Sequence, residues 1–332
     1  MKKVVLAFSG GLDTSFCVLY LKEKGYDVIT AVVNTGGFSD SKLKEIEEKS
    51  KKLGSIKHYT VDATEVIYEN IIQLMPSFCV GIRAKAAGDW DYGKDNDHIN
   101  VPEETAINLV RRVLDEGVDV AYSYRMQADH GVTQPLHFLC GGQLDRYPTI
   151  PVFINGAATP MPTTKRTVAL GRAVGQFIKS LNLENERVLV LGTGGLSHDP
   201  PTPQMGSVPP EVEEFLIAGR NPSEESRQNR QAKIIAVGQK LAAGDKSVAV
   251  PLNPEWDRAL LETFKKADFA AIEAMTEAEI RVEGGRGGQE VRSWMAAFAA
   301  LHEVGEYEMT THCYEDISEW IAGFGIVSAE LK

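Results

Sequence analysis

The stretch that decides the fold is RVLVLGTGGLSHDPP, residues 187–201. Its apolar first five residues have the length and composition of a buried strand, and the glycines that follow let the backbone turn sharply at the strand's end. Two prolines stiffen the loop beyond His198. Because open α/β sheets bind ligands at the carboxyl ends of their strands, His198 is a candidate for acid–base chemistry or metal binding. A loop histidine that only makes a structural hydrogen bond is the alternative.

Alternating strand and helix patterns surround this stretch. Strands are predicted at residues 118–123 and 151–156, and a helix at 166–181 leads to the strand before His198. This rhythm predicts an α/β fold with a parallel-rich sheet, helices on both faces and a helical C-terminal portion from about residue 211. The helices expected there lie at 227–241, 256–264 and 294–302.

The composition limits the kind of protein. The 332 residues suffice for two domains or one large one, and 43% apolar with 24% charged residues is typical of soluble globular proteins. A net charge of −11 argues against nucleic-acid or anionic-membrane binding through bulk electrostatics. The four cysteines form no CxxC pair, and no apolar run approaches the roughly 20 residues of a membrane span. We therefore expect a cytoplasmic protein with reduced thiols and no nucleic-acid or membrane partner.

Two further residues are candidates for chemistry. His130 follows Asp129 and precedes a predicted helix, so a contact between the two side chains would fix its tautomer and raise its pKa. A capped helix start is the alternative interpretation of this pair. Glu290 stands where the glycine-rich loop at 284–288 enters an apolar helix. The alternative for Glu290 is a first-turn acid that the helix dipole favours.

The first 73 residues repeat the strand–helix rhythm around a glycine-rich turn, SGGLDTS, at residues 9–15. Backbone N–H groups at such a turn, together with the hydroxyls of Ser9, Thr14 and Ser15, suit a phosphate group. Asp13 would repel a phosphate unless Mg²⁺ lies between them. A turn that only maintains the fold is the alternative. The elements expected here are strands at 4–8, 28–33 and 56–61 and helices at 16–24 and 42–53.

This heptad resembles the pyrophosphate loop of the N-type ATP pyrophosphatases, and VNTGGF at 33–38 and YTVDAT at 59–64 resemble argininosuccinate synthase. The resemblance covers residues 1–73 and implies a nucleotide-binding βαβαβ segment that takes ATP with Mg²⁺. The segments of that family that bind citrulline and aspartate have no counterpart in the chain. The residues that would hold the ATP phosphates are Ser9, Gly10, Gly11, Asp13, Thr14 and Ser15.

From about Met75 to the end the chain resembles the class III extradiol ring-cleavage dioxygenases. The resemblance implies an α/β domain over residues 74–332 that opens a 3-substituted catechol with O₂ and assembles into a homo-oligomer. Six motifs in the family's order carry it: MPSFC at 75–79, MQADHG at 126–131, PVFING at 151–156, GGLSH at 194–198, PLNPEWD at 251–257 and EWIAGFG at 319–325.

The resemblance also implies roles for single residues. His198 matches the histidine that takes the catechol proton, and His130 matches the acid and base of the later rearrangement. Glu290 matches the carboxylate of an Fe(II) site built from two histidines and one carboxylate. In the family both metal histidines lie in the N-terminal part, which the ATP-loop segment replaces here. His58 and Asp13 are the residues that could complete the metal site in their place.

Three hypotheses follow from this chimera-like pattern. The first is an Fe(II)-dependent extradiol dioxygenase, impaired by the missing metal histidines. The second is an ATP-using, adenylating ligase fragment. The third is a folded but catalytically silent protein that at most binds a nucleotide or an aromatic ligand.

Overall fold

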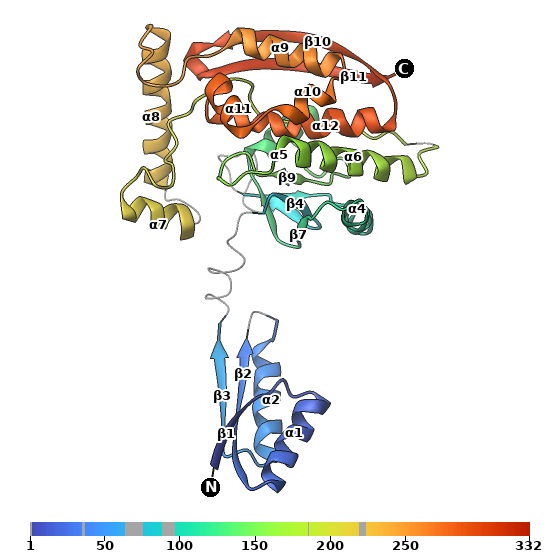
Figure 1. Ribbon diagram of the computed structural model, residues 1–332, viewed down its shortest axis with the longest axis vertical. Coiled ribbons are helices and arrows are strands. Elements are labelled where there is room, and N and C mark those ends of the chain that lie inside the picture. Colours follow the sequence, from blue (N-terminus) through green and yellow to red (C-terminus); the bar gives the residue numbers. More distant parts are fainter. Residues whose placement is uncertain (1, 35–36, 64–75, 88–96, 185, 219–223) are drawn as a thin grey trace. The chain divides into compact units, whose positions relative to one another are not determined.

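The structure is a computed structural model that describes residues 2–34, 37–63, 76–87, 97–184, 186–218 and 224–332. Contacts between Cα atoms divide the chain into two compact units. Unit 1 comprises Met1–Leu74 and Pro210–Arg220, and unit 2 comprises Met75–Pro209 and Asn221–Lys332. Both units appear in Figure 1, where the colour runs from blue at the N-terminus to red at the C-terminus.

Unit 1 contains a parallel three-stranded sheet in the order β1-β2-β3. Its helices α1 and α2 cover one face, as Figure 1 shows, because right-handed crossovers between parallel neighbours place both helices on the same side. The predicted strands and helices of this segment are confirmed. The elements of unit 1 are β1 (Lys2–Ala7), α1 (Leu12–Glu23), β2 (Tyr26–Asn34), α2 (Asp40–Lys52), β3 (Lys57–Asp62) and α7 (Pro210–Ala218).

The core of unit 1 lies between this sheet and its two helices, where Val18 of α1 and Ile46 of α2 meet Val28 and Val32 of β2. The opposite face of the sheet remains exposed, with Val5 at 67% exposure. The apolar run at 4–8 predicts a buried strand, and this prediction is wrong for Val5. Side chains alternate between the two faces of a strand, and both helices lie on the same face. The other exposed residues on strands of unit 1 include Val33, Tyr59 and Val61.

Unit 2 contains two small mixed sheets and a long hairpin. In the first sheet β4 lies between β7, which is parallel to it, and β9, which is antiparallel. In the second, β5 lies between antiparallel β6 and parallel β8. The strands are β4 (Phe78–Gly81), β5 (Ala84–Ala86), β6 (His98–Ile99), β7 (Ala121–Ser123), β8 (Met126–Ala128), β9 (Val152–Ile154), β10 (Tyr307–Ile317) and β11 (Ala322–Leu331).

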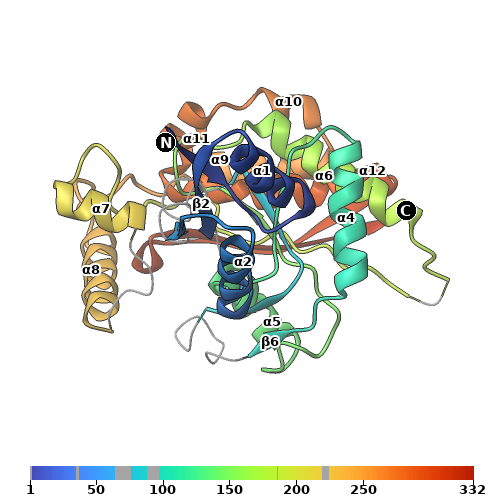
Figure 2. The same ribbon diagram turned by 90° about the horizontal axis from the view of Figure 1, so that it is seen from below.

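Helices make up most of the rest of unit 2, and Figure 2 shows α4 and α6 side by side. The α/β class is confirmed, since four of the seven strand pairings in the described residues are parallel. The C-terminal portion is helical to Val304 and then forms the β10–β11 hairpin. The helices are α4 (Glu103–Asp115), α5 (His130–Leu139), α6 (Thr164–Ser180), α8 (Glu224–Ala242), α9 (Pro254–Lys265), α10 (Phe269–Ala274), α11 (Glu277–Gly284), η3 (Gly287–Glu290), α12 (Val291–Val304) and η4 (Ser318–Trp320).

The predicted strand at 187–191 is not present. Residues 187–191 have no strand assignment, and Leu189 is 74% exposed. A strand needs a neighbour that takes up its N–H and C=O groups, and within the described part of unit 2 this segment pairs with none of β4, β7 or β9. Apolar character alone therefore did not decide its structure.

The sequence also predicts a polar loop at 88–97 and a helix restart at 219–225, and both lie largely outside the described residues. The sequence further predicts a helix that begins after Pro102, and this helix is present as α4. None of the helices in the described part of the chain combines the length and the apolar character that crossing a bilayer requires.

The closest helix packing in unit 2 joins α6 to α12 (Figure 1). Gly171 and Gly175 of α6 face the α12 backbone, and a Cβ atom at Gly171 would lie 2.3 Å from the carbonyl oxygen of Ala296. At Gly175 it would lie 2.5 Å from the carbonyl oxygen of Ala300. These glycines therefore set how closely α12 approaches, and α12 begins directly after Glu290.

The variant Gly171→Ala should destabilise unit 2 by about 1–3 kcal/mol, since the added methyl group cannot fit without a backbone shift. Glycine-to-alanine changes inside a helix with free space have the opposite sign and stabilise by roughly 0.5–1 kcal/mol. Urea unfolding followed by circular dichroism measures the difference. Lys165→Ala, at an exposed position of the same helix, is the control and should change stability by less than about 0.5 kcal/mol. A stabilised Gly171→Ala variant would contradict the packing described here.

Candidate active site

The loop after residue 191 carries His198 into a narrow space between two glycines. A Cβ atom at Gly195 would lie 2.6 Å from the His198 ring, and one at Gly287 would lie 2.1 Å from its Nε2 atom. Any larger residue at either position would displace the imidazole. Gly195 and Gly287 are therefore needed because the His198 ring lies so close to the backbone at these positions, and not only because glycine lets the chain turn.

Hydrogen bonds fix the His198 ring and backbone. The ring Nδ1 lies 3.0 Å from the carbonyl oxygen of Leu196, which can only accept, so Nδ1 carries a hydrogen and donates. The backbone N–H of His198 donates to Gly284, and its carbonyl oxygen accepts from the N–H of Gly287. The atom left for chemistry is Nε2, which lies 3.5 Å from Oε1 of Glu290.

Glu290 ends η3 and stands at the N-cap position of α12, where the positive end of the helix dipole favours a carboxylate. Its Oε2 accepts from the N–H of Gly195 at 3.1 Å, so both carboxylate oxygens face the His198 loop. The side chain as a whole is 44% exposed. The expected position of Glu290 between a glycine loop and an apolar helix is observed.

The two groups shift each other's pKa in opposite directions. Burial acts to lower the pKa of His198, but the hydrogen bond and charge of Glu290 outweigh it and raise that pKa above its ordinary value. Burial acts to raise the pKa of Glu290, but the hydrogen bond and charge of His198, the N–H of Gly195 and the charge of His130 hold it below its ordinary value. The site therefore favours an imidazolium beside a carboxylate.

His130 is the first residue of α5, and its neighbour Gly131 accepts a hydrogen bond from Thr193 of the His198 loop, so the structure brings the start of α5 to the loop that carries His198. Thr193 ties the elements together, since its hydroxyl donates to the carbonyl oxygen of Gly131 at 2.9 Å. Asp129 caps α5 by accepting from the N–H of Gly131. The capped helix start that we gave as an alternative for this pair is therefore present.

A partly buried ion pair links the loops of His198 and Glu290. Arg286 donates from its Nε to Asp199 at 2.6 Å and from its Nη2 at 3.1 Å, and its backbone N–H binds the same carboxylate. Burial acts to raise the pKa of Asp199, but the Arg286 guanidinium and the N–H of Val250 lower it overall. Neither partner was predicted from the sequence. The position of Asp199 directly after His198 was the only signal in the sequence.

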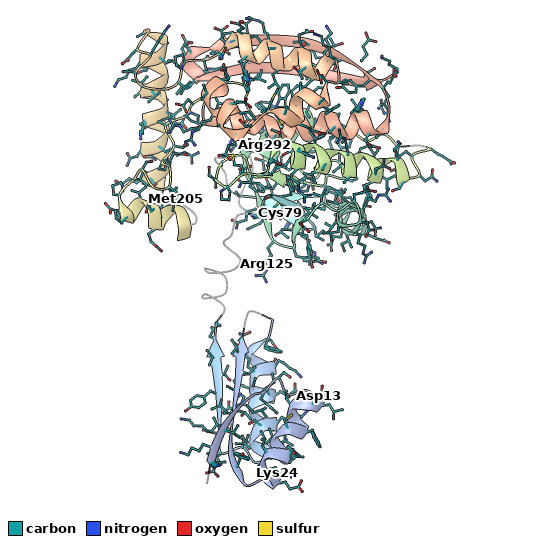
Figure 3. The ribbon with its side chains drawn as sticks, in the orientation of Figure 1. Asp13, Lys24, Cys79, Arg125, Met205 and Arg292 are labelled. Atoms are coloured by element: carbon teal, nitrogen blue, oxygen red, sulfur yellow. The ribbon has the colours of Figure 1, made fainter. Side chains whose placement is uncertain are left out.

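A buried cation fixes the turn that carries Glu290. Arg292, labelled in Figure 3, lies in the first turn of α12 and is fully buried. Its Nε donates to the carbonyl oxygen of Pro162 at 3.0 Å, and its Nη1 donates to both oxygens of Gln289. These bonds fix the turn that ends at Glu290.

The glycine turn of unit 1 connects β1 to α1, and Gly10 has a φ of 77°, in the left-handed region that favours glycine. The ammonium of Lys49 on α2 donates to the carbonyl oxygen of Gly10 at 2.6 Å. The Ser15 hydroxyl donates to the carbonyl oxygen of Gly11 at 2.6 Å. Thr14 makes a longer bond to the same carbonyl, and exposed Asp13 extends from the first turn of α1 (Figure 3).

His58 lies on β3 and faces α2 in unit 1. Its Nδ1 lies 2.7 Å from the Thr30 hydroxyl. From there a chain of hydrogen bonds between hydroxyl groups runs from Thr30 to Ser50 and from Ser50 to Ser55. Its Nε2 is buried and has no hydrogen-bond partner in the described residues. Burial lowers the pKa of His58. The side chain is therefore part of the hydrogen-bonded packing between β3 and α2.

The described residues do not form the three-ligand metal set. Glu290 has the chemistry of an Fe(II) ligand, but no group of three or more histidine, cysteine, aspartate or glutamate side chains gathers closely enough anywhere in the described ranges. The candidates Asp13 and His58 belong to unit 1, whereas Glu290 belongs to unit 2. The set that the resemblance implies is thus not assembled within unit 2.

Comparison with known proteins identifies the class as dioxygenases, oxidoreductases that incorporate O₂. The family described as "Catalytic LigB subunit of aromatic ring-opening dioxygenase" matches residues 46–325, and the chain belongs to this family. A relative from Photorhabdus laumondii, named 2,3-dihydroxyphenylpropionate/2,3-dihydroxicinnamic acid 1,2-dioxygenase, is 58% identical over 257 residues, 77% of this chain and 79% of its own. Relatives of the same name from Paraburkholderia xenovorans and Azotobacter vinelandii are 48% and 40% identical.

The coverage of these relatives differs. The Paraburkholderia match spans 77% of this chain and 79% of the relative, whereas the Azotobacter match spans 94% and 95%. A second family, described as "Arginosuccinate synthase N-terminal HUP domain", matches residues 3–80. The two resemblances seen in the sequence are therefore both confirmed, and the two family matches overlap over residues 46–80.

We expect the His198–Glu290 pair to make stability depend on pH. The pKa of His198 is raised from 6.5, so its contribution is fully present below about pH 6.5 and is lost as the pH rises through the higher folded value. The pKa of Glu290 is lowered from 4.5, so its contribution is lost as the pH falls below that value. In Glu290→Gln the dependence that comes from Glu290 should vanish, and the His198 ring should titrate at lower pH because burial then acts on it without the opposing carboxylate. NMR of the metal-free protein measures the titration.

The matched control is Glu262→Gln on the exposed side of α9, which should leave the His198 titration unchanged. A His198 ring that titrates at the same pH in the wild type and in Glu290→Gln would contradict the pairing.

Proposed function

We propose that this chain opens the aromatic ring of a 3-substituted catechol, such as 2,3-dihydroxyphenylpropionate, beside its two hydroxyl groups, with O₂ and Fe(II). The observation that carries the proposal is the pairing of His198 Nε2 with the partly exposed Glu290 carboxylate, next to His130. The printed names of the relatives support the substrate. Membership of the ring-opening family supports the reaction. The proposal includes a ring-cleaving domain that begins near residue 74 and a homo-oligomeric assembly.

The side chains support separate roles for the two histidines. His198 Nδ1 is committed to the Leu196 carbonyl oxygen, so Nε2 is the atom that would accept the catechol proton. His130, at the start of α5, would give and take a proton later in the reaction. Glu290 would bind the metal through the carboxylate that now faces His198, and metal binding would free Nε2 to act as a base.

We further propose that Fe(II) binds weakly. Among the described residues Glu290 has no two other metal ligands beside it once His130 and His198, which would act as acid and base, are set aside. Fewer protein ligands mean a lower affinity for the ion. Turnover should then need free Fe(II) in solution.

Oxygen uptake with 2,3-dihydroxyphenylpropionate is expected while Fe(II) is present in excess, and it should fall to the protein-free rate after anaerobic desalting. An oxygen electrode and the absorbance of the ring-opened product measure the rate. Removing the catalytic base in His198→Ala should lower the iron-supported rate by roughly 10²-fold or more. His312→Ala, at an exposed histidine of β10, is the control and should keep the wild-type rate.

Two outcomes would contradict these proposals. About one iron per chain retained after desalting, and lost in Glu290→Ala, would show a complete metal site and overturn weak binding. No oxygen uptake at any iron concentration would overturn the dioxygenase and leave a catalytically silent protein.

A second candidate function is phosphate binding at the SGGLDTS turn of unit 1, with ATP and Mg²⁺ as the ligand. The observation that favours it is the Lys49 ammonium at the turn, 2.6 Å from the carbonyl oxygen of Gly10. A cation beside N–H groups at a helix N-terminus attracts phosphate oxygens. The match of residues 3–80 to a HUP domain supports the same site.

Isothermal titration with MgATP should detect binding to the wild-type chain, and Lys49→Gln should weaken it by about tenfold, since an ammonium–phosphate bond is lost. Lys44→Gln, at an exposed position of the same helix, should have little effect. Absence of heat from the wild type, or equal weakening in both variants, would refute phosphate binding at this turn.

A further inference from the structure

One buried acid in unit 2 has no part in the chemistry proposed above. Asp257, in the first turn of α9, is completely buried. Among the described residues no lysine or arginine forms an ion pair with it. Its carboxylate instead accepts three hydrogen bonds of 2.7 Å, from the N–H and hydroxyl of Ser197 and from the hydroxyl of Tyr314. A buried carboxylate is costly unless its bonds are needed, so this cluster requires an explanation.

The cluster converges on the residue that precedes His198. The Ser197 hydroxyl also accepts from the N–H of Asn253, and its carbonyl oxygen accepts from the N–H of Gly323 at 2.7 Å. Ser197 therefore has bonds from the start of α9 and from the C-terminal hairpin. Both of its backbone polar groups and its hydroxyl are held, which leaves the following residue little freedom.

The hairpin approaches the carboxylate so closely that only glycine fits. A Cβ atom at Gly323 would lie 2.2 Å from Oδ2 of Asp257 and 3.2 Å from the Ser197 hydroxyl. Gly323 belongs to the EWIAGFG motif, and Asp257 ends the PLNPEWD motif. Two motifs distant in sequence from His198 thus meet at its neighbour.

We propose that Asp257 is a positioning residue for His198: its carboxylate fixes the Ser197 backbone and so directs the His198 ring toward Glu290. Without the carboxylate, the Ser197 N–H and the Tyr314 hydroxyl would be buried without partners. The loop would then relax, and the Nδ1 bond to Leu196 would be lost. The consequence for turnover rests on the proposed dioxygenase function, whereas the effect on the ring does not.

The test uses the full, metal-free chain in three forms: wild type, Asp257→Ala and Asp257→Asn. The readouts are the NMR signal of the His198 Nδ1 hydrogen and the hydrogen exchange of the Ser197 amide. In Asp257→Ala the ring signal should disappear and the amide should exchange about tenfold faster or more. Asp257→Asn keeps one acceptor oxygen for the Ser197 N–H and should restore the ring signal.

Asp268→Ala is the matched control, because Asp268 caps α10 in the same unit and its loss destabilises the fold without contact to Ser197. It should leave both readouts unchanged. If Asp257→Ala does not fold, Tyr314→Phe takes its place and should accelerate Ser197 exchange by a smaller factor. An unchanged ring signal and amide in the folded Asp257 or Tyr314 variants would overturn the proposal, as would equal changes in Asp268→Ala.

Kinetics then separate this proposal from the proposed function. If the wild type consumes oxygen, Asp257→Ala should lower kcat while KM stays within about twofold, because a misdirected base affects the transition state more than binding, and Asp257→Asn should restore most of the rate. An unchanged kcat would overturn the catalytic part of the proposal. If the wild type is inactive, the proposed function fails, and the ring and amide readouts still decide whether Asp257 positions His198.

Discussion

The close contact between α6 and α12 is the constraint on which the rest of unit 2 depends. Gly171 and Gly175 remove side chains at the crossing, so the backbones approach until only hydrogen atoms separate them from the carbonyl oxygens of α12. The apolar side of α12 then packs with α9 and the hairpin into one core. Because Glu290 immediately precedes α12, the depth of this crossing also sets where the carboxylate lies.

Buried polar groups give the two site loops their final shape. The Asp199–Arg286 pair joins the loops, Asp257 holds Ser197, and Arg292 holds the turn before Glu290. Each of these charges would be costly alone in the interior, but each satisfies several backbone or side-chain partners. Apolar packing places the helices only approximately, because it has no direction. Hydrogen bonds and ion pairs are directional, so they orient the His198 imidazole relative to the Glu290 carboxylate.

Incomplete sheets are the common feature of the two units. Unit 1 covers one face of its sheet with two helices and leaves apolar residues such as Val5 and Val61 exposed on strands. In unit 2 the apolar segment at 187–191 forms no ladder. Both observations follow from one rule: strands are stable only when neighbours take up their backbone groups and apolar side chains.

The sequence by itself determined the α/β class, most helices, the family, and the candidates His130, His198 and Glu290. These follow from periodicity and from motifs of several adjacent residues, which are local properties. Only the tertiary structure decided that the apolar run before His198 is not a strand, because strand formation depends on a partner elsewhere in the chain. It also decided that Asp257 and Arg286 hold the site. Asp257 and Arg286 lie about 60 and 90 positions away in sequence and bind the two neighbours of His198, Ser197 at 2.7 Å and Asp199 at 2.6 Å, and no local pattern encodes that proximity.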